Sequence, residues 1–427
     1  MIRWIEVKGL RALRYVSLGL DPFMVMVGPN ACGKSTLFDA LLILRDVLSS
    51  GLEAAVFGQA RMNIAPRAVS PQDLTWLRQG GGLEIAVTLE LPGDIVEKVG
   101  GKYRFARYEL GIHTDGRLGF DHETLWLTSE LRPVQSQPTG PQQRLDFPEP
   151  LSAPTHIVTP AKHRSPTGWR KVVSKVVESG NDYFRSETSD WNNLFRLGPA
   201  KSALANLPED EVKFPAATWV KRVLMEGVHR LALNAEKMRM PSPAGSSPDF
   251  LPDGSNLPWV VHELEKTPAL KRRWISHIAT SLEDLVDIRT QERQEDRSRY
   301  IELHYRSGLE APSWVLSDGT LRLLALTLLA YAPGSPALTL IEEPENGIHP
   351  KAMETVMQSL ESVYGSQILC ATHSPVVLSQ LRARQVLCFG KTEEGAVDIV
   401  RGDEHPGLRE WQSALNLGEL FAVGVLG

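Results

Sequence analysis

The sequence has few cysteines and no long apolar segment. Its three cysteines, Cys32, Cys370 and Cys388, are too few and too scattered for a disulfide framework or a zinc site, which favours a reducing compartment. The longest apolar stretch, residues 321–332, includes Arg322 and is shorter than the roughly 20 residues of a membrane-spanning helix. The charged first residues lack the apolar core of a signal peptide. We therefore expect a cytoplasmic protein without a membrane anchor.

The sequence also lacks a strong charge of either sign. It has 46 basic and 51 acidic residues, a net charge of −5, which gives no overall attraction to nucleic acids or membranes, although a local basic patch is still compatible with it. Hydrophobic residues make up 42% and charged residues 23%, as in globular proteins. The 427 residues correspond to roughly three domains or one large interleaved one.

Alternating apolar and polar residues predict a hairpin of strands at 2–7 and 13–20. A buried strand at 23–27, a glycine loop and a buried helix over 36–44 follow. Further short strands, bounded by turn residues, are expected at 83–91, 103–113 and 123–127, and they look antiparallel. The chain therefore begins as an α/β protein.

The middle of the chain has a different character. Eight prolines between 130 and 169 predict a loop or insertion, because proline ends helices and interrupts central strands. The pattern of residues 169–240 is helical, and further helices are expected from 259 and over 271–288. The charged run 291–299 is interpreted as a turn before a strand at 300–305.

The strongest chemical signal is Gly28 to Ser35, a full match to G-x-x-x-x-G-K-[ST] between a strand and a helix. Its glycines allow backbone N–H groups to face a phosphate at the positive end of the helix. Lys34 would reach the β- and γ-phosphates, and the Ser35 hydroxyl would bind Mg²⁺. The motif predicts a site for ATP and Mg²⁺.

Three other segments complete the pattern. A buried strand before Glu342 and Glu343 would supply one carboxylate for the Mg²⁺ water shell and a second to orient or deprotonate the attacking water. A strand over 367–372 delivers His373 at its carboxyl end, where α/β sheets bind ligands. Ser317 precedes an apolar helix as a candidate N-cap.

In this order, the four segments resemble the ABC-type ATPases of the SMC, RecF and OLD group. The resemblance covers about half of the chain, and the run from Glu342 to Pro350 is especially similar to stand-alone OLD-like AAA-family ATPases, which lack a Toprim domain and occur in bacterial anti-phage systems. It implies an ABC-type P-loop ATPase head with a mixed sheet, an N-terminal antiparallel β-subdomain and a mainly helical insertion. The implied division is ATPase lobe I (1–130), insertion (131–289) and ATPase lobe II (290–427).

The resemblance also implies roles for individual residues. Glu343 and His373 would be catalytic, and Ser35 and Glu342 would hold Mg²⁺. The nucleotide would be bound by the Walker A and signature residues Asn30, Gly33, Lys34, Ser35, Thr36, Ser317 and Gly319. Gln79 is a candidate for the family's Q-loop glutamine, with an ordinary polar loop residue as the alternative.

Two departures from the transporter pattern favour the OLD-like subfamily. The signature has Ser-Asp-Gly-Thr at 317–320, and Glu342 replaces the usual aspartate. Prolines and broken heptads exclude the long coiled coil of SMC proteins. No Asp-x-Asp motif of a Toprim nuclease is present.

Two biological functions remain open. The protein could be a nucleotide-switched sensor and scaffold that controls an effector protein encoded nearby, or a RecF-like ATPase that binds duplex DNA in repair. A basic cluster over 162–171 with Lys175 could contact phosphates, or it could be a solvated helix start.

The resemblance further implies a head-to-tail homodimer, or a higher oligomer of dimers, because each ATP of cassette ATPases lies between two subunits. The apolar end over 420–426 could pack on the same lobe or receive an effector.

Overall fold

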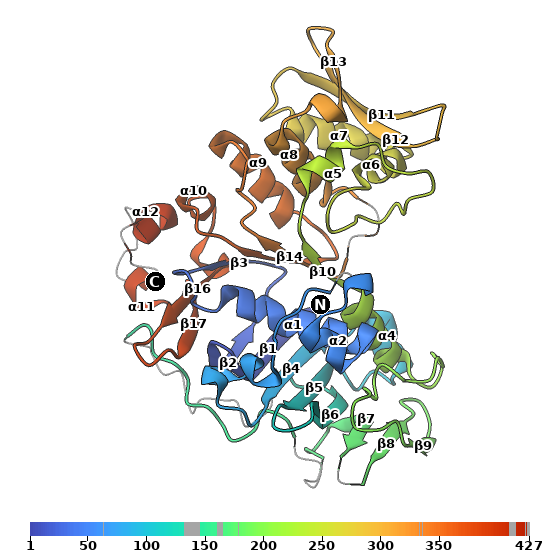
Figure 1. Ribbon diagram of the computed structural model, residues 1–427, viewed down its shortest axis with the longest axis vertical. Coiled ribbons are helices and arrows are strands. Elements are labelled where there is room, and N and C mark those ends of the chain that lie inside the picture. The colour runs from blue at the N-terminus through green and yellow to red at the C-terminus, as the bar shows by residue number, and fades with distance from the viewer. Residues whose placement is uncertain are drawn as a thin grey trace.

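The computed structural model describes residues 1–62, 64–131, 146–159, 165–177, 179–332, 334, 336–409, 416–422 and 424. Within these residues, helices lie between and around three β-sheets of eight, six and three strands (Figure 1). The expected mixed α/β fold is confirmed.

The eight-stranded sheet is antiparallel throughout and has the order β2-β1-β4-β5-β6-β7-β8-β9. Its strands are β1 (Ile2–Leu10), β2 (Leu13–Gly19), β4 (Leu83–Glu90), β5 (Phe105–His113), β6 (Gly119–Thr128), β7 (Arg170–Val176), β8 (Asn181–Arg185) and β9 (Asn192–Phe195). The expected hairpin and the strands expected at 83–91, 103–113 and 123–127, with their antiparallel pairing, are confirmed.

The helical prediction for residues 169–240 is wrong in its first part. The stretch forms β7, β8 and β9, because apolar residues such as Val173 and Phe184 are buried when these strands extend the antiparallel sheet. Helix begins only at α4 (Pro215–Glu226), and α5 (Ala235–Arg239) follows the short strand β10 (Val228–Leu231). The first part of the insertion is therefore a sheet extension, and the division at 130 and 289 stays a prediction.

The six-stranded sheet has the order β10-β14-β15-β3-β16-β17, with all pairs parallel except β16 with β17. Its other strands are β3 (Phe23–Val27), β14 (Leu338–Glu342), β15 (Gln367–Ala371), β16 (Val386–Lys391) and β17 (Val397–Arg401). Met24 and Met26 belong to one hydrophobic core and Phe23 and Val25 to another, so this sheet is buried on both faces.

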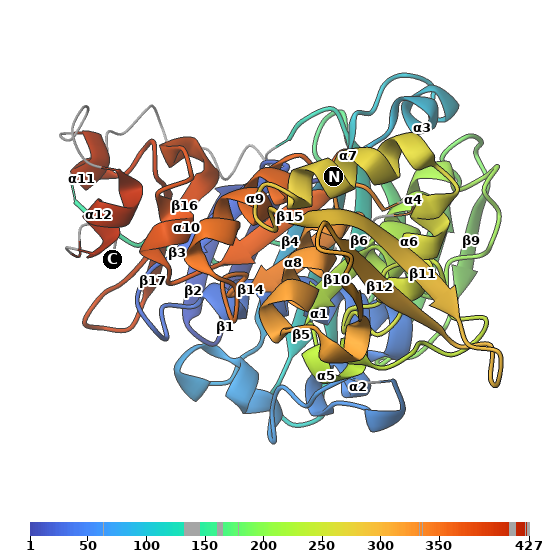
Figure 2. The ribbon, with the colours of Figure 1, turned by 90° about the horizontal axis from the view of Figure 1, so that it is seen from above.

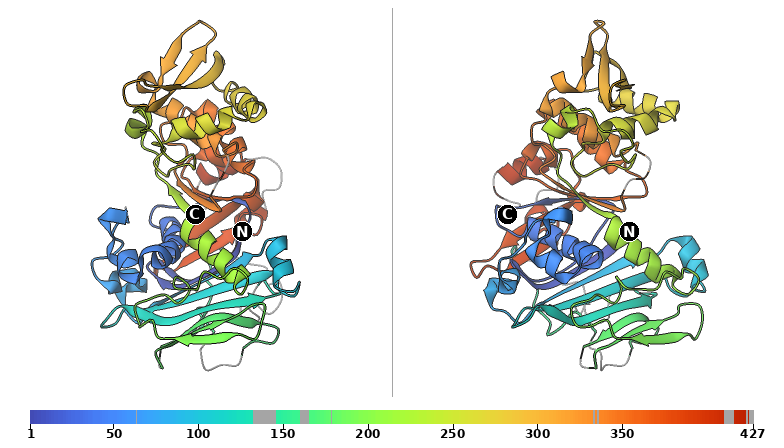
Figure 3. Two further views of the ribbon diagram at one scale, coloured as in Figure 1. Left: turned by 90° about the vertical axis from the view of Figure 1, so that its right-hand side faces the viewer. Right: turned by 45° about the vertical axis from the view of Figure 1, so that its right-hand side comes forward.

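Helices α1 (Lys34–Ser50) and α4 lie between the six-stranded and the eight-stranded sheet, with α2 (Leu52–Phe57) against α1 and α3 (Gly93–Lys98) against α4 (Figures 1 and 3). Helices α8 (Asp318–Leu328) and α9 (Pro350–Glu361) cover the opposite face of the six-stranded sheet. Helix α1 carries the glycine loop at its start, so this layer positions the site.

The third sheet lies at the far end of the molecule (Figure 3). Its antiparallel strands are β11 (Leu285–Glu292), β12 (Arg299–Tyr305) and β13 (Glu310–Pro312), packed with α6 (Leu257–Glu265) and α7 (Pro268–Ile278). The helix expected over 271–288 is thus too long, because turns at 279–284 end it and a strand begins. The predicted turn in the charged run and the strand after it are confirmed.

The C-terminal helices α10 (Pro375–Leu378), α11 (Pro406–Arg409) and α12 (Leu417–Ala422) lie at the end of the six-stranded sheet (Figure 2). Leu420 is buried in a small core with Val27 and Leu378. The described part of the apolar C-terminal end therefore packs on its own lobe, while residues 423 and 425–427 lie outside the described residues.

Candidate nucleotide-binding site

The carboxyl ends of three neighbouring parallel strands bring the predicted site residues together. In the sheet register, Glu342 of β14 lies beside Ala371 of β15, which lies beside Met26 of β3. The glycine loop follows β3, Glu343 follows β14, and His373 follows β15. This edge is where open α/β sheets bind ligands.

The glycine loop depends on two backbone conformations. Gly28 and Gly33 have φ values of 150° and 95°, in the region that favours glycine. A Cβ atom on Gly28 would lie 2.3 Å from the carbonyl oxygen of Phe389 in β16. Larger residues would therefore displace the loop from the sheet.

Lys34 is folded back onto this loop. Its Nζ donates hydrogen bonds to the carbonyl oxygens of Gly28 at 2.7 Å and Pro29 at 2.9 Å, and its exposed fraction is 7%. Burial lowers the pKa of Lys34, and this effect is opposed first by Cys32, whose Sγ lies 3.5 Å from Nζ, and then by Glu343. The ammonium thus has only carbonyl oxygens as close oxygen partners among the described residues, so an anionic phosphate would be a stronger one.

The side chains around Lys34 differ in access. Asn30 and Ser35 are exposed, whereas Thr36 is buried at the start of α1. The Ser35 side chain is therefore accessible to a ligand that binds at the loop.

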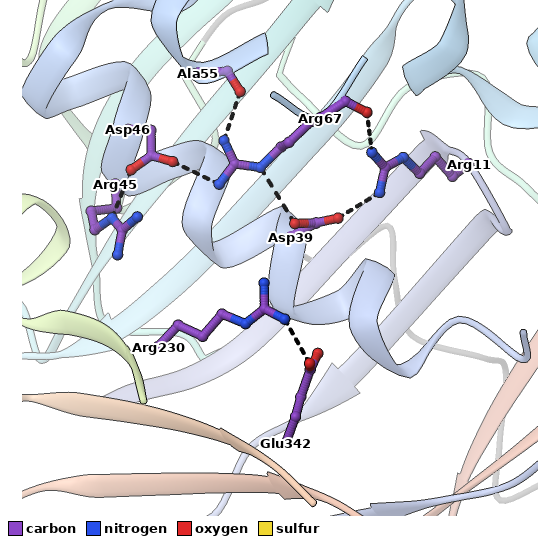
Figure 4. A network of polar contacts seen from close by, with 8 residues as sticks. All are labelled: Arg11, Asp39, Arg45, Asp46, Ala55, Arg67, Arg230 and Glu342. Carbon is purple, nitrogen blue, oxygen red and sulfur yellow. Dashed lines mark hydrogen bonds and ion pairs between the residues drawn. The ribbon is translucent and has the colours of Figure 1, made fainter. Parts of the chain in front are cut away.

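Glu342 presents two unequal carboxylate oxygens. Oε2 accepts a hydrogen bond from Arg230 of β10 at 2.6 Å (Figure 4). Oε1 is buried and has no hydrogen-bond partner among the described residues. This buried carboxylate oxygen is available to a cation, and carboxylate and hydroxyl oxygens such as those of Glu342 and Ser35 are of the kind that Mg²⁺ prefers.

Glu343 stands in a strained backbone conformation. Its φ is 48°, which is uncommon for a residue other than glycine, and its N–H donates to the carbonyl oxygen of Ala371 at 2.8 Å. Asn346 Nδ2 donates to Glu343 Oε2 at 2.5 Å. The backbone therefore turns the exposed Glu343 side chain outward at the edge of the sheet, and Asn346 fixes one of its oxygens.

His373 lies in the same electrostatic environment. Burial lowers its pKa, the charge of Lys34 lowers it further, and Glu343 and Glu345 act in the opposite direction. The imidazole is therefore held toward its neutral form, with Lys34 and Glu343 close enough to influence it.

Sequence reasoning gave no role to Glu345 or Arg230. Glu345 Oε1 accepts hydrogen bonds from Thr372 Oγ1 at 2.7 Å and from the His373 N–H at 3.4 Å, so it links the turn after β14 to the end of β15. The third carboxylate of the run 342–345 was a visible signal for Glu345. No local signal in the sequence pointed to Arg230, because the pairing of β10 with β14 brings it beside Glu342.

The signature segment is built as an N-cap. Ser317 Oγ accepts a hydrogen bond from the Thr320 N–H at 3.1 Å, and Asp318 pairs with Arg239. Among the described residues, no hydrogen bond or ion pair joins 317–320 to the glycine loop. One chain therefore brings the Walker-type residues and His373 to the same sheet edge, whereas its signature segment is not bonded to its glycine loop.

The remaining candidates do not join the site. Gln79 is exposed at the end of a short 3₁₀ turn. Neither alternative for the basic cluster describes Lys175, because residues 170–176 form strand β7 and not a helix start, and the buried Lys175 Nζ pairs with Asp182 at 2.6 Å. Lys171 lies over the Trp126 ring at 4.8 Å. Residues 162–164 of the basic cluster lie outside the described residues.

A cavity of about 350 Å³ lies elsewhere, on the eight-stranded sheet. It is lined by residues that include Lys8, Gly82, His122 and Lys175. None of its lining residues belongs to the glycine loop or to the ends of β14 and β15, so its size does not make it the nucleotide site.

Known structures share this architecture. The Smc head bound to the C-winged helix domain of ScpA matches with a TM-score of 0.50 and 15% identity, covering 93% of this chain and 97% of that one. An Smc head domain with an extended coiled coil, bound to the C-terminal domain of ScpA derived from Pyrococcus furiosus, matches at 0.49 and 13%, covering 99% and 98%. The SMC head domain from Thermotoga maritima matches at 0.41 and 11%, covering 94% and 98%. The fold is that of an ABC-type ATPase head.

No curated protein has a significant sequence match to the chain. Within the described part of the chain, every helix is too short or too polar to span a bilayer. A family model matches residues 23–379, from β3 with its glycine loop to just beyond α10. Since this match spans more than half of the sequence, the chain belongs to the family described as "AAA domain, putative AbiEii toxin, Type IV TA system".

Proposed function

We propose that the protein is a Mg²⁺-dependent ATPase that binds and hydrolyses ATP at the ends of β3, β14 and β15. The observation that carries this proposal is the meeting of the glycine loop, two carboxylates and His373 at one sheet edge. The AAA-domain family and the ABC-type fold support the same activity.

Each residue has a distinct task in this proposal. Lys34 exchanges its loop carbonyl partners for the phosphates, while the loop N–H groups and the start of α1 bind the same anion. Ser35 and Glu342 hold Mg²⁺, which supplies charge neutralisation for the phosphates when bound. Asn30, Gly33 and Thr36 complete the binding loop.

Hydrolysis requires an oriented water. Asn346 occupies Glu343 Oε2, so Glu343 Oε1 is the atom left to accept a proton or hydrogen bond from that water. A neutral His373 donates one hydrogen bond toward the γ-phosphate without adding a second full charge beside Lys34. Positioning and electrostatics then supply most of the catalysis.

We further propose that the working form is a nucleotide-switched head-to-tail dimer. In the part of the chain that the structure describes, Ser317 and Gly319 form no hydrogen bond or ion pair with their own glycine loop, and they would instead approach the γ-phosphate bound to a second copy. Each ATP would thus be shared by two subunits, and its hydrolysis would release them.

For the biological role, we propose a sensor or scaffold that controls an effector protein in anti-phage defence. The OLD-like residues 342–350 support it, as does the binding of a ScpA domain by a structurally similar head. The RecF-like alternative is less well supported, because Lys175 of the basic cluster is buried in an ion pair.

Calorimetric titration with ATP and Mg²⁺ tests binding, and release of phosphate tests hydrolysis. The wild-type protein should bind ATP and release phosphate, whereas the affinity of Lys34→Ala for ATP should be at least about tenfold lower. Lys351→Ala is a matched control, because Lys351 is an exposed lysine at the start of α9. Equal affinity of the wild type and Lys34→Ala would remove the basis for the assignment.

A further inference from the structure

A cation from the protein itself already contacts the carboxylate proposed to hold Mg²⁺. Strand β10 is the edge strand beside β14, and Arg230 lies beside Leu340 in the sheet register. Residues 340 and 342 share one face of their strand, so the Arg230 side chain reaches Glu342 on the side where α1 packs (Figure 4). The Arg230 guanidinium lies 2.6 Å from Glu342 Oε2.

The two oxygens of the Glu342 carboxylate have different surroundings. Oε2 is held by the guanidinium, while Oε1 is buried and without a hydrogen-bond partner in the described part of the chain. The other acidic side chains near α1 have separate cations: Asp39 pairs with Arg11 and Arg67, and Asp46 with Arg45 and Arg67 (Figure 4). Among the described residues, only Arg230 forms an ion pair with Glu342.

We propose that Arg230 is a built-in counter-ion of Glu342 that competes with Mg²⁺ for this carboxylate. The inference rests on the proposed function, because it concerns the same metal-binding residue. A guanidinium neutralises the carboxylate and repels a second cation, so the metal must weaken or share the pair. Half-saturation of the site would then require a higher Mg²⁺ concentration than it would without Arg230.

The size of the effect follows from the exposure of the pair. The Arg230 side chain is 46% exposed and that of Glu342 is 29% exposed. Such pairs are screened by solvent and contribute weakly, so removing Arg230 should lower the Mg²⁺ requirement by about twofold to fivefold. A larger change would need a buried pair.

The test compares Arg230→Gln with Arg222→Gln. Arg222 of α4 pairs with Glu211 on the surface at 2.6 Å, so its variant removes the same charge without touching Glu342. The measurement is the Mg²⁺ concentration that half-saturates binding of a fluorescent, non-hydrolysable ATP analogue. We expect this concentration to fall by about twofold to fivefold in Arg230→Gln and to equal that of the wild type in Arg222→Gln. Nucleotide affinity in EDTA should stay constant.

Three results would overturn the proposal. An unchanged Mg²⁺ requirement would show that the pair has no influence on the metal, and a higher one would show that Arg230 holds Glu342 in place for it. A second readout, the Mg²⁺ concentration that half-maximally shifts Tm without nucleotide, should move in the same direction, and no difference there also counts against the proposal. Absence of nucleotide binding in the wild type would instead contradict the ATPase assignment, and the Tm readout would still decide the counter-ion proposal.

Discussion

Gly319 at the start of α8 lies directly against the carbonyl oxygen of Gly347, in the turn that follows β14. A Cβ atom at position 319 would be only 2.4 Å from that oxygen. The signature segment and the turn after the Walker-type carboxylates are therefore in backbone contact. A movement of the turn that follows Glu342 and Glu343 would therefore push directly on the start of α8, where Ser317 is the N-cap.

Replacing Gly319 with alanine should destabilise the protein by about 1–3 kcal/mol, because the new methyl group must displace backbone. Urea unfolding measures the change. Gly93→Ala is the matched control, since Gly93 also lies in the first turn of a helix and has open space around it. A Gly319→Ala protein as stable as the control would contradict the close contact.

Glu343→Gln should bind ATP but hydrolyse it at least about 100-fold more slowly, because the amide cannot accept the proton of the attacking water. Phosphate release and retention of radiolabelled ATP measure the two effects. Glu354→Gln is a control, because Glu354 is an exposed residue of α9 that bonds only Gln358 among the described residues. Wild-type hydrolysis by Glu343→Gln would show that Glu343 is not the base.

Mixing two inactive variants tests the shared site. Lys34→Ala disables the glycine loop and Ser317→Arg the signature, so one of the two sites in a heterodimer keeps both parts intact. We expect ATPase activity to appear on mixing and to peak near equal amounts. If both variants are folded and exchange subunits, yet activity stays absent at every ratio, the head-to-tail dimer is wrong.

The acid stability of the eight-stranded sheet should depend on Glu109. Burial opposes its ionisation, but the His122 ring and the Arg107 guanidinium overcome this and lower the pKa of Glu109 from 4.5 to about 2. The depressed pKa gives a stabilisation of roughly 3 kcal/mol that is present above pH 4.5 and is lost as the pH falls toward 2. Urea unfolding at pH 7, 4.5 and 3 should show a steeper loss in the wild type than in Glu109→Gln. Parallel losses in both proteins would contradict this prediction.

The strands and the helix that carry the candidate site residues were predicted correctly because their signals are local, while the roles of those residues stay predictions. The glycine spacing, the buried strand before it and the helix after it all lie within residues 23–50. The strand before Glu342 and the strand before His373 are likewise continuous apolar runs. Parallel strands that are buried on both faces leave such runs in a sequence.

The elements that were missed depend on distant partners. Strand β10 has only four residues, and its pairing with β14 fixes it as a strand. The ion pair between Arg230 and Glu342 depends on that register, so no local sequence pattern predicts it. Strands β7 to β9 were missed because the helical spacing around α4 was extended backward over them.

The central sheet brings together segments that are far apart in the sequence. Gln367 at the start of β15 donates its side-chain N–H to the carbonyl oxygen of Ile2, across 365 positions of sequence. Strand β3 has β15 and β16 as its two neighbours, so during synthesis it stays unpaired until residues 367–391 have left the ribosome. Folding of this sheet is therefore late and dominated by distant contacts, and the exposed edges of β3 favour aggregation or chaperone binding until then. A truncated nascent chain that ends before β14 would carry the intact glycine motif and still have no pocket for ATP.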